Sequence, residues 1–267
     1  MIIIGEKING AIPSIRTAIE EKNEQLIGER AEAQAKAGAD FIDCAPSTST
    51  DIEYDTMVWL INIIQQVTEI PICIDSPNEK LLKRIFEEGH VKRPGMINSV
   101  NEERSKCETI FPLIAGTEWE VVGLTCDQEG IPMSVERKVE IAKSMIDKAV
   151  KYGVALNKLH IDPCVMALST SASAMENFEE CIMRIHEYAP EVKVTGAISN
   201  ISFEMPVRSL VNKSCITLAI KAGLDSAIID PCNFEMIGTI YATEALTMRD
   251  KSGRKYNRAF RKGKFGI

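Results

Sequence analysis

The sequence lacks the features of a secreted or membrane-spanning protein. No apolar run approaches the roughly 20 residues that a transmembrane helix needs. The start, MIIIGEKING, has no basic segment before its three consecutive isoleucines, so it does not resemble a signal peptide. The eight cysteines include no C-x-x-C pair and are spread singly along the chain, which favours reduced thiols. We therefore expect a soluble cytoplasmic protein.

Positive charge is also scarce. The chain has 31 Lys and Arg against 38 Asp and Glu, a net charge of −7, which argues against nucleic acid or an anionic membrane as a partner. The one basic stretch, residues 251–264, is expected to be a solvated C-terminal extension. We place residues 1–248 in one domain and residues 249–267 in this extension.

Short apolar runs alternate with longer amphipathic segments. Eight runs are predicted to be strands, and they are apolar almost throughout, as in parallel strands buried on both faces: residues 2–6, 41–44, 72–76, 95–99, 121–125, 159–162, 193–199 and 226–230. Helical patterns cover residues 12–37, 55–67, 78–88, 134–151, 206–222 and 233–248. This alternation predicts a (β/α)₈ barrel, the TIM barrel, with a doubly wound open sheet as the alternative.

Polar residues stand at the ends of the predicted strands. They are Glu6, Asp43, Asp75, Asn98, Thr125, Asp162, Asn200 and Asp230. In a barrel these ends converge on one mouth, where barrel enzymes have their active sites. The alternative is that such residues cap the following helices, and it weighs most for Asp43 and Asp230.

The expected mouth holds few cations and no recognisable nucleophile. Lys7 and Arg208 are the main cationic candidates, and Lys7 is expected to pair with Glu6. His160 lies two residues before Asp162 and is expected to be a core histidine. A site of carboxylates and amides with few cations suits a neutral, nitrogen-rich heterocycle that donates N–H and NH₂ hydrogen bonds.

Several motifs at these strand ends point to one family. They are GEKING at 5–10, DFIDC at 40–44, CIDSPN at 73–78, MINSVNEER at 96–104, GLT at 123–125, GIP at 130–132, IDP at 161–163 and SNIS at 199–202. Together, from about residue 2 to residue 246, they resemble the methyltetrahydrofolate:corrinoid methyltransferases, a pterin-binding barrel family that includes the folate domain of cobalamin-dependent methionine synthase.

The resemblance implies a role for each matching residue. Asp75, Asn98 and Asp162 are implied to hold the pterin ring, and Asn200 to reach N5, with Ser199 beside it. Glu6 and Arg208 complete the implied substrate site, and Asn200, Asp75 and Asp162 are the implied catalytic residues. One departure is Phe203, which stands where some relatives have Gln; Phe203, Glu204 and Met205 are expected to form the rim that meets the corrinoid or its carrier.

The implied reaction is methyl transfer between N5 of tetrahydrofolate and a corrinoid carried by a partner protein. Methylation of tetrahydrofolate by a methylated corrinoid is the direction we favour, and the reverse reaction from 5-methyltetrahydrofolate stays open. We expect no bound metal, and a homodimer is expected from the resemblance. Three other readings remain: a dihydropteroate synthase, which would need a basic pyrophosphate site, a zinc–thiolate enzyme using the cysteines that follow strand ends, and a folate-binding protein without activity.

Overall fold

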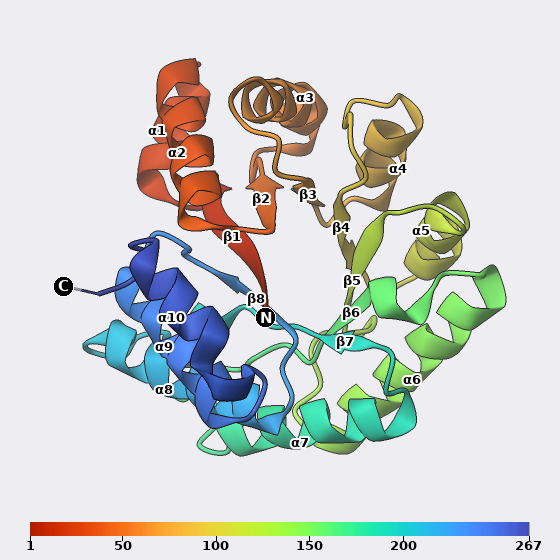
Figure 1. The fold of residues 1–267 in the computed structure, drawn as a ribbon. Coiled ribbons are helices and arrows are strands. Elements are labelled where there is room, and N and C mark those ends of the chain that lie inside the picture. The colour runs from red at the N-terminus through yellow and green to blue at the C-terminus, as the bar shows by residue number, and fades with distance from the viewer. Residues whose placement is uncertain (267) are drawn as a thin grey trace.

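Residues 1–266 of the computed structural model form a barrel of eight parallel strands surrounded by helices (Figure 1). The strands are β1 (Ile2–Asn9), β2 (Phe41–Ala45), β3 (Ile72–Asp75), β4 (Met96–Val100), β5 (Glu120–Leu124), β6 (Leu159–Asp162), β7 (Lys193–Val194) and β8 (Ser226–Ile229). Their order in the sheet is β7-β6-β5-β4-β3-β2-β1-β8. The predicted (β/α)₈ barrel is confirmed, and the open doubly wound sheet is wrong.

The α-helices follow the strands on the outside of the barrel. They are α1 (Pro13–Glu20), α2 (Glu24–Ala37), α3 (Thr50–Val67), α4 (Glu79–Glu87), α5 (Lys106–Ile114), α6 (Val135–Tyr152), α7 (Ala174–Tyr188), α8 (Arg208–Ala222), α9 (Phe234–Leu246) and α10 (Arg254–Arg261). The helix predicted over residues 12–37 is two helices, because Asn23 caps a new helix by accepting a hydrogen bond from Leu26 N.

Three helices, α5, α7 and α10, were missing from the sequence prediction, and the first two belong to the βα alternation. Helix α7 carries a clear helical spacing of buried residues, Phe178, Cys181, Ile182 and Ile185, which the sequence already displays. Helix α5 contains Pro112 and gives a weaker signal. The structure thus completes the βα alternation that the sequence showed only in part.

Strand β7 is much shorter than predicted. The strand itself contains only Lys193 and Val194, and residues 198–202 form a 3₁₀ turn, η2, instead of the end of a strand. Backbone hydrogen bonds close the barrel at this seam, from Asp225 N to Val194 O and from Ile228 N to Gly196 O. Asn200 therefore lies on a turn beyond the sheet. Thr125 and Asp230 directly follow β5 and β8, and the other five polar residues stand on strands.

The barrel interior is built in layers by the two-residue period of the strands. An apolar layer contains Ile4, Phe41, Cys73, Met96 and Val122, all nearly inaccessible to solvent. Two residues further along three of these strands stand Asp43, Asp75 and Asn98. Two residues in the opposite direction from Val122 stands Glu120, next to His160. Polar layers thus lie on both sides of the apolar layer.

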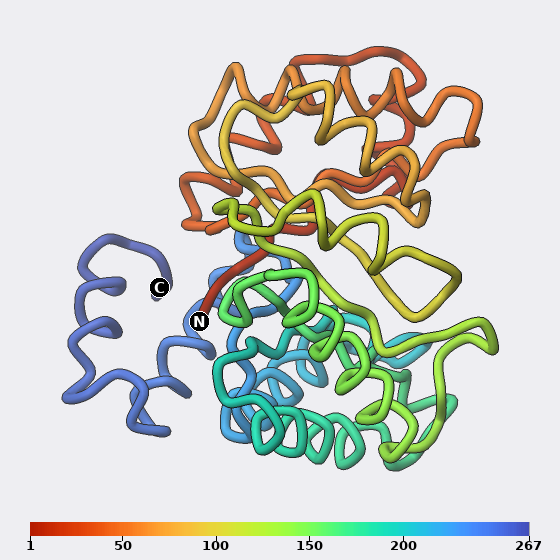
Figure 2. Tube along the Cα trace, turned by 90° about the vertical axis from the view of Figure 1, so that its right-hand side faces the viewer, coloured from red at the N-terminus to blue at the C-terminus, as the bar shows by residue number. Residues whose placement is uncertain are grey.

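The C-terminal segment does not form a solvated extension. Residues 251–261 form a short 3₁₀ turn, η3 (Lys251–Gly253), and helix α10, and Phe265 stacks on Tyr241 of α9 with only 8% of its surface exposed. Figure 2 shows this segment in blue on the same side of the molecule as the N-terminus. That expectation is corrected because the aromatic residues provide an apolar face that α9 buries. The domain boundary at residue 248 remains a prediction.

None of the helices within residues 1–266 combines the length and the apolar character needed to cross a bilayer.

Candidate active site: a carboxylate cup at the barrel mouth

A cavity of about 900 Å³ opens at the carboxyl ends of the strands. We call it the cup. Its lining includes eight residues that the sequence indicated: Glu6, Asp75, Asn98, Asp162, Ser199, Asn200, Phe203 and Arg208. Asp43 also lines it, whereas Thr125 is fully buried outside the lining, and Glu204 and Met205 are not among the residues that line it. The structure therefore brings together the predicted substrate residues from four strands, one turn and one helix.

A bulge in β1 aims two consecutive residues at the cup. The pairing of β1 with β2 shifts register between Gly5 and Ile8, and both Glu6 and Lys7 line the cavity. Lys7 Nζ lies 3.2 Å from Asp230 Oδ2, so the expected pair of Lys7 with Glu6 is wrong. Burial raises the pKa of Glu6 to about 7, although Lys7 acts in the opposite direction.

Asp43 and Asp75 stand on neighbouring strands, and Asn98 follows on the next. Asn98 Nδ2 donates a hydrogen bond to Asp43 Oδ1 at 3.5 Å. Burial raises the pKa of Asp43 to about 6, against hydrogen bonds from Cys73 and Asn98. Burial also raises the pKa of Asp75 well above its usual value, with the charges of Asp43 and Glu53 adding to the shift. These carboxylates lack a cation at hydrogen-bonding distance within the described chain.

Asp162 is held by the turn that follows β6. Its Oδ1 accepts a hydrogen bond from Cys164 N at 2.7 Å, and the buried Lys138 donates to Pro163 O at 2.7 Å and Cys164 O at 2.8 Å. Lys138 thus supports the turn rather than the carboxylate. Burial raises the pKa of Asp162 to about 6, although the Cys164 hydrogen bond and Lys138 lower it.

Arg208 supports the turn that carries Asn200. Its Nη2 donates to Ser199 O at 2.7 Å and its Nε to Ser202 Oγ at 3.0 Å, while the guanidinium lies over the ring of Phe203. Asn200 itself is exposed at the opening of the cup. A reacting group bound below Asn200 is therefore accessible from outside the protein.

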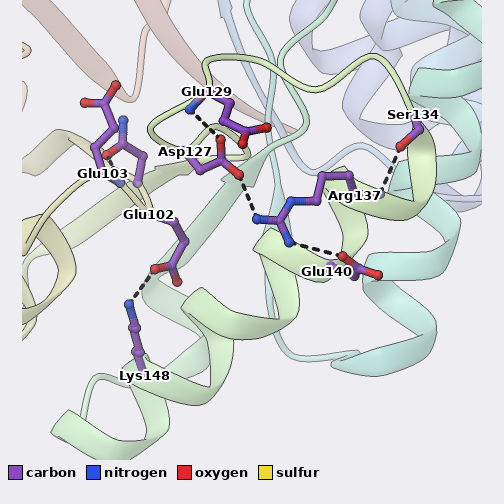
Figure 3. A network of polar contacts seen from close by, with 9 residues as sticks. Glu102, Glu103, Asp127, Glu129, Ser134, Arg137, Glu140 and Lys148 are labelled. Atoms are coloured by element: carbon purple, nitrogen blue, oxygen red, sulfur yellow. Dashed lines mark hydrogen bonds and ion pairs between the residues drawn. The ribbon is translucent and has the colours of Figure 1, made fainter.

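One wall of the mouth is a well-braced loop between β5 and α6. Asp127 accepts hydrogen bonds from Glu129 N at 2.9 Å and from Arg137 Nη2 at 2.8 Å, and Arg137 also reaches Glu140 (Figure 3). Figure 3 also shows Glu102 paired with Lys148 below this loop. The bracing presents Ile131, which is 48% exposed, to the cup.

Sequence reasoning missed several amides of the cup. Asn9, Asn212 and Asn233 also line the cavity, and Asn212 Oδ1 is buried without a hydrogen-bond partner among residues 1–266. Asn212 lies one helical turn after Arg208, a spacing from which it could have been found.

The cysteines near the mouth do not gather. Cys44, Cys126 and Cys164 are buried, Cys232 is exposed, and burial raises the pKa of each thiol. Within residues 1–266, no group of three or more His, Cys, Asp or Glu side chains is arranged to hold a metal ion.

Comparison with known proteins gives the cup a family context. The pterin binding enzyme family matches residues 14–230. The chain belongs to this family. It is 47% identical over 268 residues to the methylcorrinoid:tetrahydrofolate methyltransferase of Eubacterium limosum, with 100% of this chain and 98% of that protein covered. It is 30% identical over 243 residues to the methionine synthase of Mycobacterium tuberculosis, with 86% of this chain but 20% of that protein covered.

Solved structures of this pterin-binding fold include dihydropteroate synthases. A dihydropteroate synthetase crystallised with a product has a TM-score of 0.69 and 16% identity, with 92% of this chain and 94% of that chain covered. The enzyme from Clostridium difficile has a TM-score of 0.68 and 18% identity, with 92% and 96% covered. At these identities the likeness shows the fold alone.

Proposed function

We propose that this protein transfers a methyl group between a corrinoid carried by a partner protein and N5 of tetrahydrofolate. The observation that carries the proposal is a cup of carboxylates and amides that opens beside the exposed Asn200. The methyltransferase of Eubacterium limosum, which aligns over the whole chain, supports the same reaction.

The electrostatics of the cup suit a pterin ring. Asp75, Asn98 and Asp162 offer acceptors and one amide to the ring's N–H and amino groups. Burial disfavours the charged forms of Asp75 and Asp162, and hydrogen bonds donated by the pterin would favour them again. Binding of the pterin therefore offsets the cost of burying these carboxylates. For this reason the ligand-free cup favours a ligand that donates hydrogen bonds.

The chemistry requires control of charge at N5. In the favoured direction N5 loses its proton and gains the methyl group, while the electron pair of the cobalt–carbon bond stays with cobalt. In the reverse direction a neutral tertiary amine leaves poorly, so N5 must first acquire positive character. Asn200 cannot supply the proton itself, but its amide can stabilise charge that develops at N5 in the transition state.

Access from a partner fits the position of Asn200. The corrinoid supplies or accepts the methyl group when its carrier docks, and the barrel positions the pterin for that encounter. Phe203, 56% exposed at the opening, and its neighbours Glu204 and Met205 are the proposed rim. We favour methylation of tetrahydrofolate because the name of the Eubacterium limosum relative states that direction.

A homodimer is part of the proposal, together with a cytoplasmic location. The homodimer is supported by exposed apolar side chains on the neighbouring helices α8 and α9 or just before them: Val207, Leu210, Leu218, Phe234 and Leu246. Light scattering on the purified protein and on Leu210→Asp tests this, and a monomeric wild-type protein would remove the dimer from the proposal.

A corrinoid methyl-transfer assay in both directions tests the function. Purified protein should convert methylcobalamin and tetrahydrofolate to 5-methyltetrahydrofolate, and the reduced corrinoid with 5-methyltetrahydrofolate should react in reverse. Absence of transfer despite tight folate binding would favour a binding protein without activity. Formation of dihydropteroate from p-aminobenzoate and the pterin pyrophosphate would favour the synthase, for which Lys7 is poorly placed because it pairs with Asp230.

A further inference from the structure

A second cavity adjoins the cup. Its volume is about 720 Å³, and Asp75 and Pro77 line both cavities. The remaining lining comes from the loops after β2 and β3, from the starts of α3 and α4, and from Arg104 in the loop after β4. A ligand anchored on Asp75 can therefore extend into this second cavity, which we call the tail cavity.

Two cations of the tail cavity have no carboxylate partner. Lys80 and Arg104 are both exposed, and neither forms an ion pair with another of residues 1–266. The two cations that line the cup differ, since Lys7 is paired with Asp230 and Arg208 is bonded to Ser199 and Ser202. Of the four cations that line the two cavities, those of the tail cavity are the ones left for an anionic ligand.

The start of α3 adds partial positive charge to the tail cavity. Ser49, the residue before this 18-residue helix, makes no side-chain capping bond, and Ser47, Thr48 and Thr50 line the cavity at this end. N–H groups at a helix start attract anions, although Asp51 and Glu53 already stand in the first turn of α3. Thr48 Oγ1 is also buried without a hydrogen-bond partner in the described chain. Three carboxylates, Glu53, Asp75 and Glu79, line the cavity as well, and Glu53 already accepts a hydrogen bond from Ser76 Oγ at 2.6 Å.

Two of the three loops that bound the tail cavity have unusual backbones. Ser47 and Arg104 both adopt positive φ values near 50°, which L-residues rarely do outside sites where the surrounding structure requires it.

From this combination we infer that the tail cavity binds the anionic, glutamyl end of a folate whose pterin occupies the cup. The inference rests on the proposed function. Lys80 and Arg104 would face the glutamyl carboxylates, Glu79 could accept the amide N–H of the tail, and longer γ-glutamyl chains would bind more tightly because each adds a carboxylate.

The test compares ligands that differ only in their tails. Dissociation constants are measured by calorimetry for 6-methyltetrahydropterin, which has no tail, for tetrahydrofolate and for its triglutamate. Wild-type protein should bind them with rising affinity in that order. In Lys80→Ala/Arg104→Ala the ratio of affinities between triglutamate and tailless ligand should fall by about tenfold, as expected for the loss of two partly screened ion pairs, and added salt should reduce the wild-type ratio.

Two further variants sharpen the result. Lys83→Ala/Lys92→Ala removes one positive charge from α4 and one from the loop after it. Neither Lys83 nor Lys92 lines the tail cavity, so this variant should keep the wild-type ratio of affinities. Thr50→Trp fills the tail cavity without changing its charge and should lower the ratio. Melting curves confirm that each variant is folded.

The outcomes separate the inference from the function. An unchanged ratio in both Lys80→Ala/Arg104→Ala and Thr50→Trp overturns the inference, since the tail would then leave the cup elsewhere. A change confined to the KM for the corrinoid carrier also overturns it and would assign the cavity to docking. Failure of the wild-type protein to bind any of the three pterins would instead overturn the proposed function.

Discussion

The two polar layers of the barrel interior treat their charges in opposite ways. At the amino end, Glu120 accepts hydrogen bonds from the fully buried His160 at 2.5 Å and from Lys193 at 2.9 Å, and His160 also bonds to Ser226. Burial acts to raise the pKa of Glu120, but these partners outweigh it and the pKa lies below its usual value. The prediction that His160 is a core residue is confirmed.

At the carboxyl end, the carboxylates of Asp43 and Asp162 form no ion pair with another of residues 1–266. Asp43 and Asp162 are more deeply buried than Glu120, and the pKa of each is raised to about 6. Burial outweighs the hydrogen bonds to both carboxylates and, at Asp162, the charge of Lys138. The protein itself supplies hydrogen-bond donors to the layer around Glu120. The layer at the carboxyl end, Asp43, Asp75, Asn98 and Asp162, still needs donors from a ligand, and we call it the ligand layer.

The largest expected effect concerns Asn200, which lies at the opening of the cup. Asn200→Ala should lower the rate of methyl transfer by about 10²- to 10³-fold, because its hydrogen bond strengthens as charge develops at N5. Asp75→Ala should mainly weaken tetrahydrofolate binding, since its contact is the same in the ground and transition states. Steady-state kinetics and calorimetry on both variants separate the effects. Equal losses of affinity without loss of rate would contradict the assignment.

Replacing a ligand-layer carboxylate should stabilise the empty protein. Asp162 has a raised pKa, so the folded state holds its proton more tightly than the unfolded state, and stability from this group is lost as the pH rises through about 6. Asp162→Asn should therefore unfold with a free energy higher by about 3 kcal/mol at pH 8, and with little difference at pH 4. Urea titrations at both pH values check this, and a less stable variant at pH 8 would contradict it.

Replacing the carboxylate of Glu120 at the amino end by an amide should instead lower the free energy of unfolding. Glu120 has a lowered pKa, so its stabilisation is present above its usual pKa and is lost as the pH falls. Glu120→Gln should cost about 1–2 kcal/mol of unfolding free energy at pH 8 and less at acid pH, with tetrahydrofolate affinity retained. The opposite pH trends of Glu120→Gln and Asp162→Asn are the sharpest form of the comparison, and parallel trends would refute it.

A smaller effect on the transfer rate is expected at the rim, whose residues Glu204 and Met205 belong to neither polar layer. Glu204→Lys/Met205→Arg should slow transfer with the carrier protein several-fold, because a transient interface is small and depends on few contacts. Tetrahydrofolate affinity should not change. If rates with the carrier and with free methylcobalamin are both unaltered, this segment is not the docking rim.

Removal of metal should have the smallest effect of all. Tetrahydrofolate affinity after chelator treatment should equal that of untreated protein, because the cup binds through carboxylates and amides. Loss of binding that zinc or magnesium restores would instead place a metal in the ligand layer, and elemental analysis of the protein would identify it.

The barrel and most members of the cup could be predicted from the amino-acid sequence. Eight apolar runs set the strands, and the two-residue period carries Asp43, Asp75 and Asp162 to the inner side of their strand ends. Asn98 and Asn200 were also among the polar residues at the predicted strand ends, and the family motifs added the roles implied for them. The helical spacing of α7 was also present in the sequence.

Only the tertiary structure decided which charges meet. Lys7 pairs with Asp230 because β1 and β8 are neighbours around the closed barrel, whereas in sequence Lys7 stands next to Glu6. The shift in pKa at each carboxylate depends on burial by side chains from distant strands, and the tail cavity is enclosed by three loops far apart in the chain. Such properties depend on distances between segments, and sequence spacing determines distances only within a segment.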